Sequence, residues 1–186
     1  TEMWHETNDR NSGLIEENPH FPSQMEGWII SGATVYVSNP FYKCVHESYK
    51  NHHSYDAVHL PDVDPSYIPR TRFTPVRDGD RYRKSCKELS WSNDGRCVID
   101  VPRVIFRKMM SVTGERTLTP SIIPAGPAHI NGAYTIGFRK EDYVALAAGY
   151  MSGLPYDLFV KATNRSNMRF DLARHLPLPV SDEISW

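Results

Sequence analysis

Prolines recur at short intervals through the second quarter of this 186-residue chain and exclude a long helix there. Proline fixes φ and lacks a backbone N–H donor, so it interrupts a regular helix. Residues 38–80 hold prolines and other turn-forming residues at short intervals: Asn39-Pro40, Pro61, Asp64-Pro65, Pro69, Pro75 and Asp78-Gly79. We therefore expect a long, ordered but irregular stretch, with short elements near residues 55–60 and 70–76.

The clearest strand pattern runs from Cys97 to Met110. The segment is rich in β-branched residues, which favour strands. A period of two places Arg103, Ile105 and Arg107 on one face, and Val98, Val104 and Phe106 on the other. Two arginines opposite an apolar face predict a half-buried strand that faces a ligand. Pro102 indicates an edge position, a bulge or a break.

Further strands are expected over residues 28–30, 34–37, 116–123 and 133–138, and helices come last. Residues 140–151 repeat apolar side chains at helical spacing, at Val144, Ala147, Ala148 and Met151. Shorter helices follow over 156–162 and near 170–175. These patterns predict an α+β fold, with a mixed, mostly antiparallel sheet and C-terminal helices packed against it. We expect an irregular leader or the tail of a linker over residues 1–25, one domain over 26–180 and a tail over 181–186.

Composition narrows the class of protein. Hydrophobic residues at 40% and charged residues at 23% indicate a globular chain. No apolar run approaches the ~18 residues that span a membrane, and the start shows no secretory signal. Cys44, Cys86 and Cys97 are an odd, widely spaced set, which argues against a disulfide scaffold and a cysteine zinc site. A reduced, cytoplasmic setting is the expectation.

The net charge of −1 hides a strong asymmetry along the chain. Residues 1–69 hold 3 basic and 10 acidic side chains, whereas residues 70–116 hold 12 basic and 6 acidic ones. A local field of this kind attracts a polyanion, and arginine, which dominates the basic block, binds phosphates and guanine edges through its planar fork. The alternative is that these arginines are surface charges paired with the acidic first third.

Motifs for catalysis are weak. Asn39-Pro40-Phe41-Tyr42 is similar to the Asn/Asp-Pro-Pro-aromatic catalytic loop of amino-group DNA methyltransferases, but it lacks the second proline, and no glycine-rich cofactor loop is present. A turn is the better interpretation. No G-x-S-x-G motif exists and no cysteine has an identifiable partner histidine. The residues themselves therefore predict no catalytic site.

Two alternatives stay open. His52, His53 and His59, with aspartates nearby, could ligate the metal of a metal-dependent hydrolase, although their spacing matches no known zinc pattern. The Tyr-, Trp- and Pro-rich loops are also compatible with a protein-interaction module.

The binding features are stronger than the catalytic ones, because they combine cations with hydrogen-bonding side chains. Arginine and lysine neutralise phosphates, while Asn, Ser and Thr bond phosphates or base edges. No metal ligands are predicted. The candidate DNA-binding residues are Arg70, Arg72, Arg103, Arg107, Lys108, Thr113, Arg116, Thr117, Lys161, Asn164, Arg165, Asn167 and Arg169.

Several passages resemble the target recognition region of bacterial adenine-specific DNA methyltransferases, including single-chain type II restriction-modification enzymes and phage-defence methylases. The main one is Val101-Pro-Arg-Val-Ile-Phe-Arg-Lys108 with Thr113-Gly-Glu-Arg-Thr-Leu-Thr-Pro-Ser-Ile-Ile-Pro124. The others are Asn39-Pro-Phe-Tyr-Lys43, Tyr67-Ile-Pro-Arg-Thr71, and Leu154-Pro-Tyr-Asp-Leu-Phe159 continuing to Pro179. Together they span roughly residues 28–180.

This resemblance implies sequence-specific recognition of duplex DNA, so that an adenine is flipped outward for N6 methylation. It further implies a catalytic domain N-terminal to Thr1, which binds S-adenosylmethionine. No cofactor is expected for the present residues, and their partners would be double-stranded DNA and that N-terminal domain. The resemblance does not assign base-contacting residues, because these vary between family members.

Overall fold

The computed structural model describes residues 1–36, 39–76 and 79–177. Three sheets organise them. The first is four-stranded, in the order β1 (Ile15–His20), β5 (Thr71–Pro75), β2 (Ile29–Ile30) and β8 (Ala128–His129). Its pairs are antiparallel except β2–β8, which is parallel.

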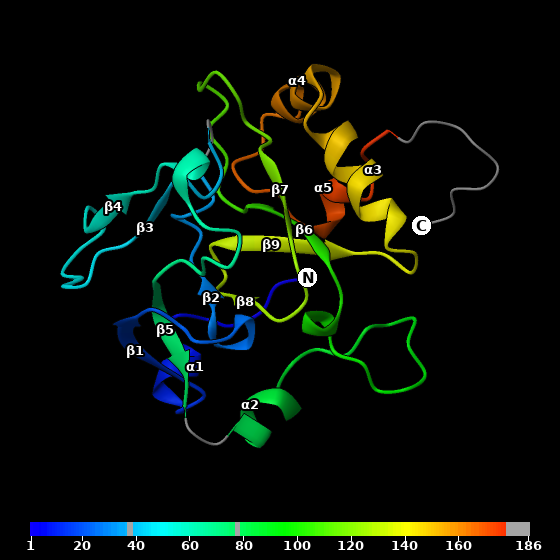
Figure 1. Cartoon of the computed structure of the whole chain (residues 1–186). Coiled ribbons are helices and arrows are strands. Elements are labelled where there is room, and N and C mark those ends of the chain that lie inside the picture. Colours follow the sequence, from blue (N-terminus) through cyan, green and yellow to red (C-terminus); the bar gives the residue numbers. More distant parts are fainter. Residues whose placement is uncertain (37–38, 77–78, 178–186) are drawn as a thin grey trace.

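The second sheet is a hairpin of β3 (Lys43–Val45) and β4 (Tyr55–Ala57). The third is antiparallel, with β6 (Arg103–Arg107) between β7 (Pro120–Ile123) and β9 (Ala133–Gly137). Figure 1 shows β3 and β4 at one edge of the molecule and the C-terminal helices at the other.

Helices are short, except for two near the C-terminal end of the described residues. These are α3 (Asp142–Met151) and α4 (Leu154–Ala162), followed by α5 (Phe170–Ala173). The first part of the chain holds α1 (Asn8–Asn11) and α2 (Gly79–Lys84), with 3₁₀ turns η1 (Met25–Gly27), η2 (Leu60–Asp62) and η3 (Val98–Asp100). The predicted α+β class, with mostly antiparallel strands and C-terminal helices, is confirmed.

The core lies on both faces of β6. Val104 and Phe106 pack with residues of α3 and α4, such as Val144 and Val160. Ile105, on the opposite face, packs with Trp28 and Ile30 of the N-terminal half. Both faces of the central strand are therefore covered, and only Arg107 at its end is partly exposed.

The irregular leader expected over residues 1–25 is wrong. Ile15–His20 forms β1, which pairs with β5, and Trp4 is buried, with its indole N–H donating to the Tyr82 hydroxyl at 3.0 Å. The proline and polar residues of this segment argued against a strand in the sequence. The structure accommodates them because β1 is an edge strand, where proline is tolerated. The tail expected over 181–186 lies outside the described residues.

Residues 32–34 form a turn, and residues 35–36 are in no strand, where a strand was expected over 34–37; residue 37 is not described. The turn is closed by the Thr34 hydroxyl, which donates to the carbonyl of Ser31 at 2.7 Å. The interpretation of Asn39-Pro40-Phe41-Tyr42 as a turn is confirmed: the Tyr42 N–H donates to the Asn39 carbonyl, and Phe41 has a φ of 62°.

Candidate nucleic-acid interface

A groove of about 670 Å³ lies between the β3–β4 hairpin, the end of β6 and the segment before α5. Its lining is basic and aromatic. Five cationic side chains reach it, from Lys43, Arg72, Arg107, Lys108 and Arg169, together with the aromatic side chains of Tyr36, Tyr49, His52 and Tyr55.

Backbone pairing explains why residues far apart in the sequence meet here. Met109 at the end of β6 forms an antiparallel bridge with Asn167. The Met110 N–H donates to the Ser166 carbonyl at 2.9 Å, and the Met168 N–H donates to the Lys108 carbonyl at 2.8 Å. The polar segment before α5 thereby continues the sheet beside β6 and places Asn167 and Arg169 next to Arg107 and Lys108.

Two glycines in the groove wall let its backbone segments approach each other. A Cβ at Gly32 would lie 2.3 Å from the carbonyl oxygen of Gly132, a distance that no side chain tolerates. The Gly132 carbonyl also accepts from the Lys108 N–H at 3.1 Å. The Gly32–Gly132 contact therefore joins the loop after β2 to the turn before β9.

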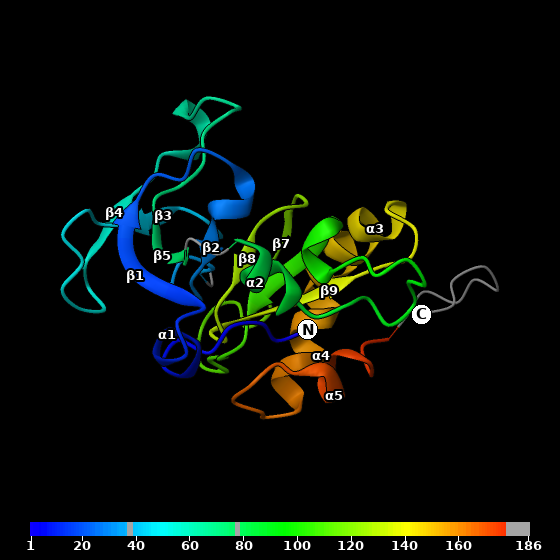
Figure 2. The same cartoon turned by 90° about the horizontal axis from the view of Figure 1, so that it is seen from below.

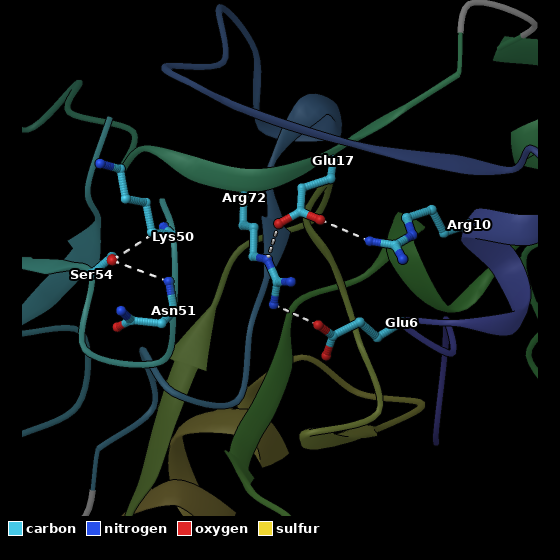
Figure 3. Close-up of polar contacts among 7 residues, drawn as sticks. All are labelled: Glu6, Arg10, Glu17, Lys50, Asn51, Ser54 and Arg72. Atoms are coloured by element: carbon cyan, nitrogen blue, oxygen red, sulfur yellow. Dashed lines mark hydrogen bonds and ion pairs between the residues drawn. The ribbon is translucent and has the colours of Figure 1, made fainter. Parts of the chain in front are cut away.

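Acidic residues of the opening segment neutralise part of the groove. Arg72 is paired with both Glu6 and Glu17, and Glu17 also accepts from Arg10 at 2.8 Å (Figure 3). Lys108 is paired with Glu2 at 2.8 Å. Within the described residues, Arg72 and Lys108 thus have their charge balanced by carboxylates.

Lys43 and Arg107, unlike Arg72 and Lys108, have no carboxylate within ion-pair distance among the described residues. The Lys43 ammonium lies 4.7 Å and 5.0 Å from the ring centres of Tyr36 and Tyr55. Desolvation, together with the positive charge of Arg107, lowers its pKa. The Nε of Arg107 is enclosed and has no hydrogen-bond partner among the described residues.

No ion pair within 4.0 Å is found for Lys43, Arg107 or Arg169 in the part of the chain that the structure describes. Three cations at one concave surface, two of them close enough to disfavour each other, leave a positive field that an anion would relieve. The neighbouring tyrosines contact cations of the groove through their ring faces, Tyr36 and Tyr55 with Lys43 and Tyr49 with Arg72, and so hold them at the groove wall. The arrangement can therefore hold phosphates beside an aromatic wall.

Five of the thirteen candidate residues line this groove: Arg72, Arg107, Lys108, Asn167 and Arg169. The other eight lie elsewhere. The predicted arginine-rich block therefore does not converge as a whole on one surface. For Arg70 and Arg72 the alternative interpretation holds, since both are paired with acidic residues of the first third.

Arg103 is the clearest correction. Its side chain is 1% exposed, and its guanidinium donates to the Pro127 carbonyl and contacts the Met3 sulfur. Desolvation lowers its pKa to about 10. The half-buried strand expected here is wrong because α3 and α4 cover one face of β6 and the N-terminal half covers the other, so Arg103 is not available to DNA.

Arg116, Thr117 and Lys161 gather around a different group, the buried carboxylate of Asp157. The backbone N–H groups of Thr117 and Leu118 donate to Asp157 at 2.7 Å, and Lys161 lies 3.1 Å from it. Arg116 is 3.7 Å away. Thr117 is buried, so its assignment to a DNA surface is wrong, and this cluster instead connects the loop after β6 to α4.

The remaining candidates are scattered. Arg70 lies beneath the β3–β4 hairpin and pairs with Asp56 at 3.1 Å. Thr113 is exposed in the loop before β7. Asn164 and Arg165 line a separate shallow depression, which Asn167 and Arg169 also border.

The histidines named for a metal site are not brought together as ligands. His52 and His53 lie side by side at the tip of the hairpin, with ring centres 3.8 Å apart, while His59 pairs with Asp62 at 2.7 Å. Among the described residues, no three His, Cys, Asp or Glu side chains are placed to hold a metal ion.

Sequence reasoning missed Lys43 and the three groove tyrosines. The one available signal was the recurrence of tyrosine at positions 36, 42, 49 and 55, on both sides of Lys43. Because this spacing follows neither a strand nor a helix period, only the folded hairpin shows that the rings converge.

Comparison with known proteins adds no identification: no family model, curated protein or solved structure matches the chain. None of the helices in the described ranges is long and apolar enough to cross a membrane.

Proposed function

We propose that this chain binds duplex DNA through the basic groove, as the target recognition part of an adenine-specific DNA methyltransferase. The supporting observation is the convergence of Lys43, Arg107 and Arg169, none of which has an ion pair within 4.0 Å among the described residues, beside three tyrosines. The methyl transfer and the S-adenosylmethionine that supplies the methyl group would belong to a separate catalytic domain.

Phosphate contact by these three cations makes a quantitative prediction. Each neutralised phosphate releases counterions, so log K falls with log salt at a slope of about −0.9 per contact. Three contacts correspond to a slope of about −2.7, and hence to an approximately 40-fold loss of affinity between ~50 and ~200 mM salt.

The test measures fluorescence anisotropy of a labelled duplex at several salt concentrations. Arg107→Gln should reduce the slope by about one and weaken binding to all sequences, while Arg96→Gln, which removes an equally charged but remote side chain, should leave both unchanged. Lys43→Gln and Arg169→Gln repeat the test if Arg107→Gln lowers the melting temperature. Salt-independent binding, or no binding to duplex DNA, would overturn the proposal.

A further inference from the structure

The β3–β4 hairpin forms a separate two-stranded ribbon. Its strands pair antiparallel from Lys43–Ala57 to Val45–Tyr55 and are joined by residues 46–54. In both Figure 1 and Figure 2 the hairpin extends outward at the edge of the molecule opposite α3. The tip of the ribbon is therefore available to a large partner.

The ribbon is fixed to the body of the protein through its strands and through Tyr49 of the joining loop. Arg70 donates to the Val45 carbonyl and to Asp56, both at 3.1 Å, so one guanidinium connects the two strands to β5. The guanidinium of Arg72 lies 4.1 Å from the ring centre of Tyr49, and that ring contacts Tyr55 edge to face. These contacts set the direction of the hairpin relative to the groove.

The turn at the tip is also held in one conformation. The Ser54 hydroxyl accepts from the N–H groups of Lys50 and Asn51 at 3.2 and 3.3 Å (Figure 3). Asn51 accepts from the His53 N–H at 2.9 Å, and the His46 N–H donates to the Ser54 carbonyl at 3.0 Å. A turn with this many internal bonds needs little ordering when it binds, which lowers the entropic cost of a contact.

The side chains at the tip are exposed and rich in hydrogen-bonding groups. Lys50, Asn51, His52 and His53 are all exposed, and Glu47 adds a carboxylate. His52 also lines the groove. Lysine and histidine N–H groups donate to guanine O6 and N7, an asparagine amide pairs with adenine, and a carboxylate accepts from cytosine N4.

We propose that the β3–β4 hairpin inserts its tip into the major groove of duplex DNA and that Lys50, His52 and His53 contact base edges there. The inference rests on the proposed function, because it needs DNA held in the basic groove. A two-stranded ribbon fits the major groove, which is about 12 Å wide. Lys43, at the base of the ribbon, would contact the flanking backbone while the tip reaches the bases.

This division of roles separates affinity from specificity. Phosphate contacts carry no sequence information, whereas base-edge contacts supply the discrimination between sites. Removing tip side chains should therefore relax sequence preference more than it weakens binding to arbitrary DNA.

The experiment selects bound duplexes from a pool with a randomised central segment, using the full 186-residue chain. The variants are His53→Ala and Lys50→Ala, which lie outside the groove lining and spare the Ser54 and Asn51 side chains that hold the turn. His59→Ala, an exposed histidine outside the hairpin, is the matched control. Circular dichroism melts verify that each variant is folded.

We expect the wild type and His59→Ala to enrich the same motif. The hairpin variants should lose preference at one or more positions by at least about fivefold, while affinity for a random duplex changes less than about threefold. Unchanged selection by the hairpin variants overturns the inference and leaves the proposed function intact. Binding of wild type without any enriched motif overturns the inference and also the target-recognition role, and it leaves only duplex binding by the groove. An equal loss for random and selected duplexes would make the tip a backbone contact and would also overturn it. If the wild type binds no duplex, the proposed function itself fails.

Discussion

Replacing Asp157 tests whether the loop after β6 is held by one buried carboxylate. Asp157 lies in the first turn of α4 and is 5% exposed at its side chain. Its Oδ1 accepts from the N–H groups of Thr117 and Leu118, and its Oδ2 lies 3.1 Å from Lys161. Asp157→Ala removes every one of these acceptors.

The cost follows from the groups left behind. A buried donor without a partner costs about 1–3 kcal/mol, and two such N–H groups remain here, so we expect a loss of about 3–5 kcal/mol. Asp157→Asn keeps a carbonyl oxygen for the two N–H groups but loses the charge opposite Lys161, so we expect a smaller loss of about 1–2 kcal/mol.

The pH dependence has a definite sign. Desolvation alone would raise the pKa of Asp157, but the hydrogen bonds from Leu118, Thr117 and Lys161 together lower it below its ordinary value. A lowered pKa in the folded state adds stability above the unfolded value of about 3.9, and that stability is lost as the pH falls through the folded value. The gap between wild type and Asp157→Asn should therefore close below about pH 4.

The assay is urea unfolding followed by circular dichroism at pH 7 and at lower pH. Asp171→Ala is the control, because this carboxylate also lies in the first turn of a helix but is exposed and bonded to Arg165. Surface pairs contribute about 0–1 kcal/mol, so the control should stay near wild type. An Asp157→Ala protein within about 0.5 kcal/mol of wild type would refute the reasoning.

Three further predictions concern packing and buried titratable groups. Gly32→Ala should destabilise by about 1–3 kcal/mol through its clash with Gly132, whereas Gly149→Ala, with open space around the new Cβ, should not lower the melting temperature. Burial lowers the pKa of His129 in the folded protein to about 3. The unfolded protein therefore binds a proton here below about pH 6.5, and the folded state loses stability as the pH falls. From pH 7 to pH 5 the free energy of unfolding should drop by about 2 kcal/mol more in wild type than in His129→Gln. Burial raises the pKa of the Cys86 thiol to about 12, so iodoacetamide at pH 8 should label it far more slowly in the folded protein than in urea, and equal rates would contradict its burial.

Local sequence patterns predicted the second half of the fold well. The strand at β9, the return strand at β7 and the helices α3 and α4 lie close to the expected positions. These elements pack against their sequence neighbours around β6, so a periodic apolar pattern is enough to identify them. In the first half, β1 and β2 pair with β5, which is over forty residues beyond β2. Such non-local pairing leaves no periodic signal, which is why the leader was mistaken for irregular structure.

Charge was a poorer guide than periodicity, for a physical reason. A run of arginines in the sequence shows only that the segment is basic. A binding surface depends on which of those side chains lack a carboxylate partner after folding. The acidic first third supplies Glu2, Glu6, Glu17 and Asp56, whose partners are Lys108, Arg72 and Arg70. Folding thus neutralises much of the block that the sequence singles out.

Among the described residues, the groove cations with no ion pair within 4.0 Å come from three separate places: Lys43 in the hairpin, Arg107 at the end of β6 and Arg169 before α5. Only one of them belongs to the arginine-rich block. Their convergence requires the bridge between Met109 and Asn167 and the close approach of Gly32 to Gly132, neither of which has a local sequence signature. Loosening the Met109–Asn167 bridge or the Gly32–Gly132 contact should therefore weaken DNA binding by the groove as much as removing the charge of Arg107 does. This holds although the glycines themselves are uncharged.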